Sequence, residues 1–374
     1  MKKTIAAILC LALSTGLYGC SESKESGNTK APPNQVTQAK AESSQNTTTP
    51  IRADKTIPAL AKQPFIINET PAMYTYVDME NDIEKLQAIC GPMIRVEKLC
   101  DTADGRVVHD IILGNPNGDN QILIFGAMHA REYITTQVVM RQLLSAIDAK
   151  NGYGRTYKGI PLDELLRDVT IHFVPMNNPD GVTISQLGPA GLKREEIRSR
   201  VASMLDDEPA QWKANAVGVD LNRNFDAGWQ EFVGSPGPSM ERFKGAYPGS
   251  EPEAAALIRL TQDAHIKCSI SYHTCGALIY WYYKQEGDVL RRSQDFAQCI
   301  SDATGYPLDD DYTAVDAAGY KDWAVYKLGI PSITIEVGAE NGGEIDNPVP
   351  MSQWNGIWDR NKDAVFAAAY YLKK

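Results

Sequence analysis

The sequence predicts an α/β fold, a single domain in which a mostly parallel mixed central sheet is flanked by helices. Two observations support this fold class. Compact apolar runs alternate along the chain with longer segments whose apolar residues recur at helical spacing. Neither an internal repeat nor a second linker interrupts the alternation after residue 57. Because helices that alternate with buried strands connect neighbouring parallel strands, the pattern indicates one layered α/β domain.

The first expected elements are a helix and a strand. Apolar residues between 79 and 90 fall on one helical face, and Asp78 fits the N-cap of that helix. Residues 107–113 have the composition of a strand, and the Asn-Pro-Asn-Gly sequence at 115–118 that of the turn into the next one.

Further strands and helices follow in alternation. Ser250 and Glu253 have the spacing of a capping box, which predicts the start of one of these helices. The expected strands cover residues 121–126, 169–174, 268–272 and 332–337, and the expected helices cover residues 132–147, 250–265, 289–303 and 358–372.

The charge of the chain limits its partners. The 374 residues carry a formal net charge of −10, and 43% of them are hydrophobic. This length and composition suffice for a large core. The negative average field disfavours non-specific binding to nucleic acid or to an anionic membrane surface. We therefore expect no nucleic-acid partner.

The first 20 residues have the pattern of a signal peptide. Lys2 and Lys3 form a positive start, and the apolar stretch at 5–17 is too short to span a bilayer comfortably. The stretch ends in Leu-Tyr-Gly-Cys, which resembles a bacterial lipobox with Cys20 as the lipidated residue. An ordinary signal peptide with an incidental Cys is the alternative. We expect export to the cell envelope, in the periplasm or with membrane attachment through Cys20 only.

Residues 21–56 are rich in Ser, Thr, Asn, Gln, Lys, Glu and Pro and contain almost no large apolar residue. Such a segment buries too little surface to offset the entropy lost on ordering, so it predicts a flexible linker. Residues 57–374 then form the one folded domain.

Five of the seven cysteines follow the predicted signal peptide, after Cys10 and Cys20. An odd number in an oxidising compartment predicts at least one free thiol. Cys90 and Cys100 are close enough in sequence to bridge a short turn, but the pairing stays open. No two cysteines stand three residues apart, which excludes a zinc site built from Cys-x-x-Cys pairs.

Four polar side chains stand where strands of the predicted sheet end. His129 and Glu132 follow the strand at 121–126, His273 follows the strand at 268–272, and Glu336 lies near the end of the strand at 332–337. Ligands of such sheets gather at the carboxyl ends of the strands. We therefore expect these four side chains to meet at one edge of the sheet.

His129, Glu132 and His273 have the ligand types of a catalytic zinc site, which takes three protein ligands and keeps a fourth position for water. The His-x-x-Glu spacing alone is a weak signal, and a core histidine or an acid in the first turn of a helix would explain it as well. Glu336 is harder to explain structurally, because a carboxylate in an apolar strand needs a partner.

The surrounding segments resemble motifs of the zinc carboxypeptidase (carboxypeptidase A) superfamily. The similar segments, in the order of the family, are GAMHAREY (126–133), VPMNNPDGV (174–182), GVDLNRNFDAGW (218–229), SYHTCGALIYW (271–281) and IPSITIEVG (330–338). The resemblance implies a zinc peptidase domain over 57–374 that binds one Zn²⁺ through His129, Glu132 and His273. It also implies that Glu336 is the general base that takes a proton from the attacking water.

The same resemblance implies how substrate is held. Arg131, Asn222 and Arg223 match residues that bind the substrate, and an Arg fork suits a carboxylate. Where the family has an oxyanion-stabilising Arg after a Trp, this chain has Lys213. Lys213 carries the same charge without the fork. The family's mobile active-site Tyr has no clear counterpart, and we choose Tyr312. Two arginines are alternatives to the lysine: Arg198 and Arg200.

Segments at 273–281, 318–323 and 347–354 are similar to the bacterial γ-D-glutamyl-meso-diaminopimelate peptidases of the superfamily, which act on peptidoglycan stem peptides. Lys321 matches the base of the side-chain pocket, where a cation favours a carboxylate-bearing substrate side chain. We therefore expect a peptide or muropeptide substrate, cleaved between γ-D-Glu and meso-diaminopimelate. Val217 departs from the Arg that many members of this branch carry, so the bond stays open.

Two other functions remain. A conventional metallocarboxypeptidase would release one C-terminal residue. A non-catalytic lipoprotein would only bind cell-wall peptide, although such a protein has no need for all four residues at the sheet edge. A Ser nucleophile is disfavoured because no G-x-S-x-G elbow occurs.

Overall fold

The computed structural model describes residues 57–206, 208–312, 317–339 and 347–374. The predicted signal peptide (1–20), the predicted linker (21–56) and the lipidation site at Cys20 lie outside the described residues. Within the described part, none of the helices has the length and apolarity that a membrane span needs.

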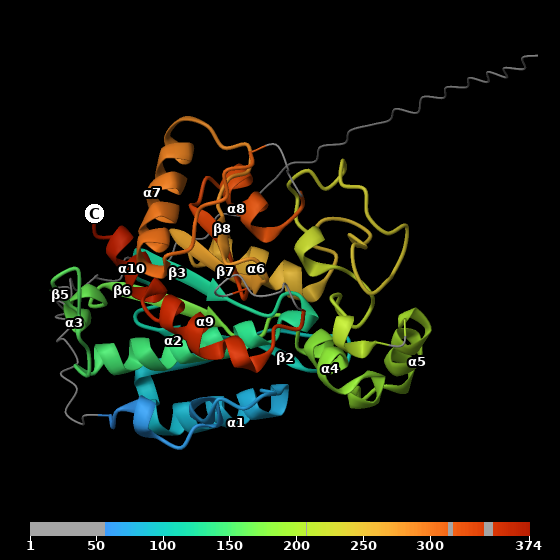
Figure 1. Ribbon diagram of the computed structural model, residues 1–374, viewed down its shortest axis with the longest axis horizontal. Coiled ribbons are helices and arrows are strands. Elements are labelled where there is room, and N and C mark those ends of the chain that lie inside the picture. The colour runs from blue at the N-terminus through green and yellow to red at the C-terminus, as the bar shows by residue number, and fades with distance from the viewer. Residues whose placement is uncertain (1–56, 207, 313–316, 340–346) are drawn as a thin grey trace, which may run out of the picture. The chain divides into compact units, whose positions relative to one another are not determined.

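A mixed sheet of seven strands runs through the described residues (Figure 1). The strands span Ile94–Asp101 (β1), Val107–Leu113 (β2), Asn120–Phe125 (β3), Val169–Val174 (β6), Cys268–Thr274 (β7), Leu278–Tyr280 (β8) and Ser332–Val337 (β9). Their order in the sheet is β1-β2-β6-β3-β7-β9-β8. The inner strands β6, β3, β7 and β9 are parallel, whereas β1, β2 and β8 run antiparallel to their neighbours. A separate short pair is formed by β4 (Thr156–Tyr157) and β5 (Ile160–Pro161).

The pleat of the central strands divides the core into two layers. On β3, Ile122 and Ile124 belong to one hydrophobic cluster, whereas Leu123 and Phe125 belong to another. Successive side chains of a strand point to opposite faces, so the two clusters lie on opposite sides of the sheet. All four side chains are fully buried, as expected of a parallel strand that is covered on both faces.

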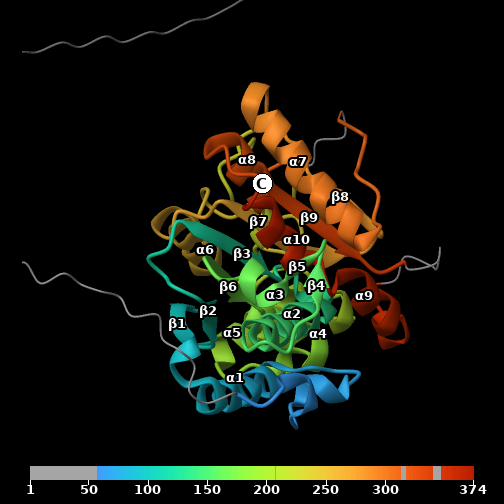
Figure 2. The same cartoon turned by 90° about the vertical axis from the view of Figure 1, so that its left-hand side faces the viewer.

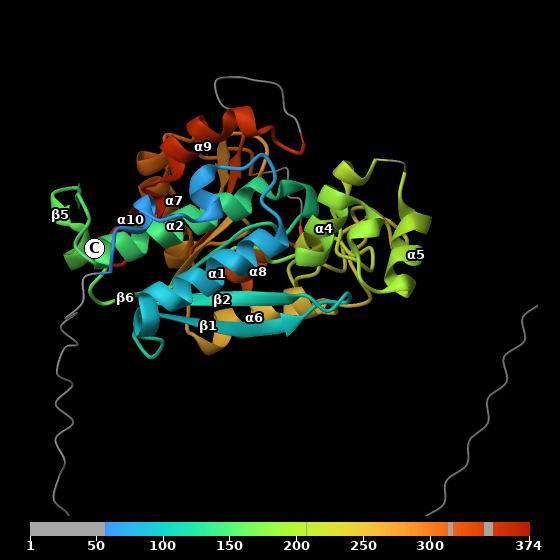
Figure 3. The same cartoon turned by 90° about the horizontal axis from the view of Figure 1, so that it is seen from below.

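Helices cover both faces of the sheet (Figures 1 and 2). Side chains of α1, α2, α7, α9 and α10 belong to the cluster that contains Ile122, and those of α6 and α8 belong to the other cluster. Seen from below, α1 lies next to β1 and β2 (Figure 3). The helices span Tyr76–Cys90 (α1), Ile134–Lys150 (α2), Leu162–Leu165 (α3), Pro179–Leu187 (α4), Glu195–Met204 (α5), Pro252–Asp263 (α6), Gly287–Thr304 (α7), Tyr320–Lys327 (α8), Trp354–Asn361 (α9) and Ala364–Tyr371 (α10).

The predicted fold class is confirmed, and three predicted strands have the expected bounds: 107–113, 169–174 and 332–337. Several local expectations are wrong. Thr75 is the N-cap of α1, and Asp78 is the third helical residue of its capping box. The closing helix is two helices, α9 and α10. The pairing of Cys90 with Cys100, which the sequence left open, does not occur, because both are free cysteines.

The expected capping box at Ser250 and Glu253 is also wrong. Helix α6 begins at Pro252, and Glu251 is its N-cap residue without a side-chain capping bond. Proline suits the first helical position because its missing N–H would have no partner there. Glu253 is therefore buried inside the first turn, at 1% exposure, instead of reaching back to cap the helix.

Candidate metal centre

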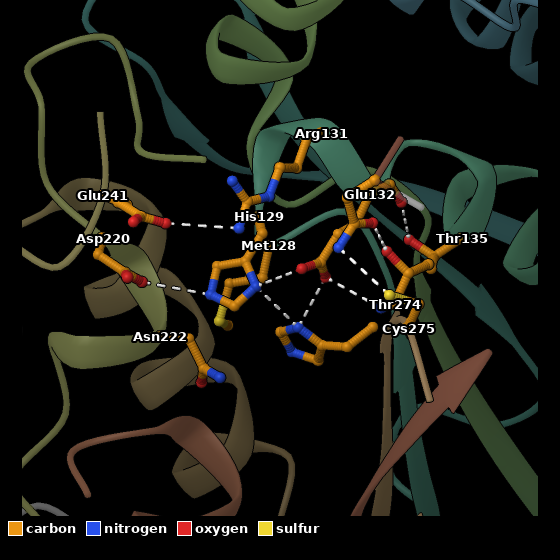
Figure 4. Close-up of polar contacts among 12 residues, drawn as sticks. Met128, His129, Arg131, Glu132, Thr135, Asp220, Asn222, Glu241, Thr274 and Cys275 are labelled. Carbon is orange, nitrogen blue, oxygen red and sulfur yellow. Dashed lines mark hydrogen bonds and ion pairs between the residues drawn. The ribbon is translucent and has the colours of Figure 1, made fainter. Parts of the chain in front are cut away.

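Two segments bring His129, Glu132 and His273 together at the carboxyl ends of adjacent parallel strands, as expected. His129 and Glu132 follow β3, and Glu132 closes a short 3-10 helix over Ala130–Glu132. His273 is the next-to-last residue of β7, which pairs directly with β3. Figure 4 shows the side chains of His129 and Glu132 turned toward the same point.

The donor atoms of the three side chains are in mutual contact. Nδ1 of His129 lies 2.8 Å from Oε1 of Glu132, and Nδ1 of His273 lies 2.9 Å from Oε2 of the same carboxylate. The two Nδ1 atoms are 3.0 Å apart. All three residues are buried, with exposures of 4%, 3% and 1% for His129, Glu132 and His273.

This donor set fits a zinc ion. Two imidazoles and one carboxylate are the ligands of a common catalytic zinc site. Donors around a tetrahedral ion, with bonds of about 2.0–2.1 Å, lie roughly 3.3 Å apart, so small side-chain shifts would open the cluster to that size. Within the described residues it is the one group of three or more His, Cys, Asp or Glu side chains whose donor atoms come close enough for a metal.

Further polar groups orient these donors. Oδ1 of Asp220 lies 3.2 Å from Nε2 of His129, on the side of the ring away from the cluster. The backbone N–H of Thr274 donates to Oε2 of Glu132 at 3.2 Å. Such partners fix the tautomer and angle of a metal ligand. Sequence reasoning did not single out Asp220, although it lies in the GVDLN segment two residues before Asn222.

The cluster shifts the pKa values of its acids. Burial alone would raise the pKa of Glu132, but the charges and hydrogen bonds of His129 and His273 outweigh it and hold that pKa well below its usual range. Burial likewise opposes ionisation of Asp220, yet Lys213 and His129 hold its pKa far below the ordinary value. Both carboxylates are therefore anionic, which suits a bound cation.

Glu336 faces the cluster from the neighbouring strand. It stands opposite His273 in the register of β7 and β9, and its Oε2 has no hydrogen-bond partner among the described residues. Burial, together with a smaller effect of the nearby carboxylate of Glu132, raises the pKa of Glu336 to about 7 against the opposing effect of His273. A carboxylate with such a pKa can accept a proton near neutral pH and release it again.

One cavity of about 460 Å³ joins the cluster to most of the predicted substrate-binding residues. Asn222 has its Oδ1 occupied by the backbone N–H of Tyr320, so its amide nitrogen remains as a donor. Gly319 must stay small, because a Cβ there would lie 2.9 Å from that Oδ1. The predicted residues that line the cavity are His129, Glu132, Lys213, Asn222, Arg223, Lys321 and Glu336.

Lys321 lies in the cavity as a paired cation. Its Nζ donates to the backbone oxygen of Tyr282 at 2.8 Å and to Oδ1 of Asp322 at 2.5 Å. Asp309 and Asp311 line the same cavity. The part of the cavity lined by Lys321 therefore contains both a cation and several carboxylates.

Two predicted substrate-binding residues lie outside the lining of this cavity. Arg131 donates to the backbone oxygen of Gln211 at 3.1 Å and pairs with Glu241 at 3.4 Å (Figure 4). The ring of Tyr312 packs on Trp281 and Tyr282, and its residue is 49% exposed. The alternative cations Arg198 and Arg200 pair with acids of their own helix α5 and do not line the cavity.

Known proteins are similar to this chain in sequence. A sequence model described as zinc carboxypeptidase matches residues 79–362. The chain is 31% identical over 304 residues to the γ-D-glutamyl-L-diamino acid endopeptidase 1 of Lysinibacillus sphaericus, covering 80% of this chain and 72% of that protein. It is 25% identical over 317 residues to carboxypeptidase B of Astacus astacus, covering 80% of this chain and 97% of that protein.

The fold is also found among solved structures. Bovine thrombin-activatable fibrinolysis inhibitor, in complex with tick carboxypeptidase inhibitor, matches with a TM-score of 0.64 at 20% identity, over 81% of this chain and 98% of that one. Carboxypeptidase A from Helicoverpa armigera matches with a TM-score of 0.60 at 18% identity, over 84% of this chain and 79% of that one.

Proposed function

The chain belongs to the zinc carboxypeptidase family and is a zinc metallopeptidase, and from this premise we propose that it is exported and cleaves peptidoglycan stem peptides between γ-D-glutamate and meso-diaminopimelate. The observation that carries the proposal is the shared cavity, in which the donor cluster and Glu336 adjoin a pocket that contains charges of both signs.

Each residue of the cavity has a role in this reaction. His129, Glu132 and His273 would hold the zinc, which when bound supplies a Lewis acid for the scissile carbonyl and lowers the pKa of water. Glu336 accepts the proton of the attacking water and passes it to the leaving amine. Lys213 stabilises the negative charge that develops on the carbonyl oxygen.

The far end of the cavity suits a zwitterionic side chain. Asn222 and Arg223 would bind a carboxylate next to the scissile bond. The ammonium of Lys321 would bind a second carboxylate, and Asp309 or Asp311 would bind an amine. Meso-diaminopimelate carries both groups on its side chain. The relative from Lysinibacillus sphaericus, named for action on a γ-D-glutamyl-L-diamino acid bond, supports the same substrate class.

Digestion of a defined tetrapeptide stem tests the proposed bond. The purified full chain would be incubated with L-Ala-γ-D-Glu-meso-diaminopimelate-D-Ala and zinc, and the products weighed by mass spectrometry. We expect release of the dipeptide meso-diaminopimelate-D-Ala. Release of D-Ala alone would support a conventional metallocarboxypeptidase, which Asn222 and Arg223 also favour because they suit a free terminal carboxylate. Absence of any cleavage with zinc present would favour the non-catalytic peptide-binding lipoprotein.

Export and membrane attachment through Cys20 need a separate test. The full chain and a Cys20→Ala variant would be expressed in a bacterial host, followed by fractionation and mass measurement of the mature N-terminus. We expect the unaltered chain in the membrane fraction with lipid on Cys20, and the variant in the soluble envelope fraction. Recovery of both proteins in the cytoplasm would contradict the proposal.

A further inference from the structure

We propose that Asn347 is a positioning residue that fixes the segment carrying Lys213 against the end of the metal-binding strand β7. The inference rests on the proposed function, because Lys213 has a role only if the cavity hydrolyses an amide. Asn347 begins the segment 347–354, whose sequence is similar to the bacterial γ-D-glutamyl-meso-diaminopimelate peptidases. That similarity assigns no role to Asn347.

The side chain of Asn347 binds the two residues that follow His273. Its Oδ1 accepts a hydrogen bond from Oγ1 of Thr274 at 2.5 Å, and its Nδ2 donates to Sγ of Cys275 at 3.5 Å. Thr274 in turn donates its backbone N–H to Glu132. The side chain of Asn347 therefore holds the end of β7, where the backbone of Thr274 orients the candidate metal ligand Glu132.

The backbone of Asn347 binds the opposite side of the cleft. Its carbonyl oxygen accepts a hydrogen bond from Nε2 of Gln211 at 2.7 Å. The carbonyl of Gln211 holds the guanidinium of Arg131 at 3.1 Å. Two residues further on, the carbonyl of Lys213 accepts the backbone N–H of Ala130 at 3.0 Å.

These bonds link the end of β7 through Asn347 to Gln211, and Lys213 lies two residues further along the same segment. The neighbouring Val349 is 5% exposed and packs where Gly338 lacks a side chain, since a Cβ there would lie 2.8 Å from it. Asn347 is thus held from the side of β9 as well. Loss of the Asn347 side chain removes the hydrogen bonds to Thr274 and Cys275 but leaves the backbone carbonyl of Asn347 bonded to Gln211. Loss of the Gln211 side chain removes the hydrogen bond to that carbonyl instead.

A set of variants tests the positioning of Lys213 through kinetics. The full chain with Asn347→Ala or Gln211→Ala is expected to lose about tenfold in kcat, with KM changed less than about threefold, because the affected charge acts in the transition state. In a Lys213→Ala background the same substitutions should have almost no further effect, as expected of residues that act through one another. Asn347→Asp keeps the acceptor for Thr274 and should restore part of the loss. Asn117→Ala, in an exposed turn, is the matched control.

Hydrogen exchange of the metal-free proteins gives a readout that needs no activity. In Asn347→Ala and in Gln211→Ala, the amides of residues 130 and 210–214 should exchange faster than in the unaltered chain and in the Asn117→Ala control. Unchanged exchange there would overturn the inference even if stem peptides are cleaved. Faster local exchange in a protein that cleaves nothing would instead support the link and contradict the proposed function. Equal kinetic losses with and without Lys213 would also overturn it.

Discussion

Nδ1 of His129 faces Nδ1 of His273 at 3.0 Å, with the carboxylate of Glu132 in contact with both rings. The two imidazole nitrogens can form a hydrogen bond at this distance only if one of them carries a proton. The carboxylate of Glu132 competes with the other ring for that proton. A divalent cation satisfies all three donors at once. The pair therefore links folding stability to metal binding.

Removal of zinc should lower both stability and activity. A metal that binds only the folded state adds about 2.7 kcal/mol to the free energy of unfolding when present at 100 times its dissociation constant. We expect dialysis against a chelator to abolish hydrolysis and to lower the melting temperature, and added zinc to restore both. Metal analysis of the native protein checks the stoichiometry, for which we expect one zinc per chain. A melting temperature insensitive to chelator would contradict the assigned site.

Glu336→Gln should separate metal binding from chemistry. The amide keeps the shape of the side chain but cannot accept a proton, and loss of a general base lowers rates by about 10²–10⁴-fold. Zinc content should stay at that of the unaltered chain. Glu195→Gln, an exposed position on α5, is the control and should leave kcat unchanged. Full activity of Glu336→Gln would discard the assigned mechanism.

Asp220→Asn should weaken metal binding without removing a ligand. The carboxylate of Asp220 lies 3.2 Å from the outer nitrogen of His129, and loss of such a partner typically lowers metal affinity about 10–100-fold. Competition with a chromogenic chelator measures the zinc affinity directly. An affinity equal to that of the unaltered chain would mean that Asp220 does not orient the ring.

The sequence predicted the metal-binding residues better than the residues on the loops around them, which form the rim of the site. Strands such as β3 contain a compact apolar run, and parallel strands bring their carboxyl ends together, so the convergence of His129 and His273 was predictable from the sequence. The rim depends on loop conformations that no periodic pattern records. Asn347 makes hydrogen bonds to residues far away in the sequence, Asp220 contacts the ring of His129 at 3.2 Å, and Arg131 pairs with Glu241.

Lys321→Met should change which substrate side chain is preferred. A hydrogen bond to a charged group contributes about 1.5–3 kcal/mol, so loss of the ammonium should lower kcat/KM about tenfold or more for a stem peptide with meso-diaminopimelate. A stem peptide with L-Lys at the same position lacks the side-chain carboxylate and should lose far less. The ratio of the two kcat/KM values is the measurement, because a general loss of folding lowers both equally. Lys284→Met, exposed outside the cavity, is the control, and an unchanged ratio in Lys321→Met would remove Lys321 from substrate recognition.

Glu253 should make the folded protein less stable as the pH rises. Burial, with the nearby carboxylates of Glu251 and Asp180, raises the pKa of Glu253 to about 8, well above its value in an unfolded chain. The folded state therefore binds the proton more tightly. The stability that this proton contributes is fully present below the unfolded pKa and is lost as the pH rises through about 8, at on the order of 1 kcal/mol per pH unit in between.

Glu253→Gln replaces this group with a neutral side chain of the same shape. The difference in unfolding free energy between the variant and the unaltered chain should grow in favour of the variant from pH 5 to pH 8 and then level off. Chemical denaturation at a series of pH values measures it, and the other titrating groups cancel in the difference. The variant Glu195→Gln, at an exposed acid of α5, should show no such trend. A difference that stays constant between pH 5 and pH 8 would mean that Glu253 is ionised in the folded protein, with a cation or water as its partner.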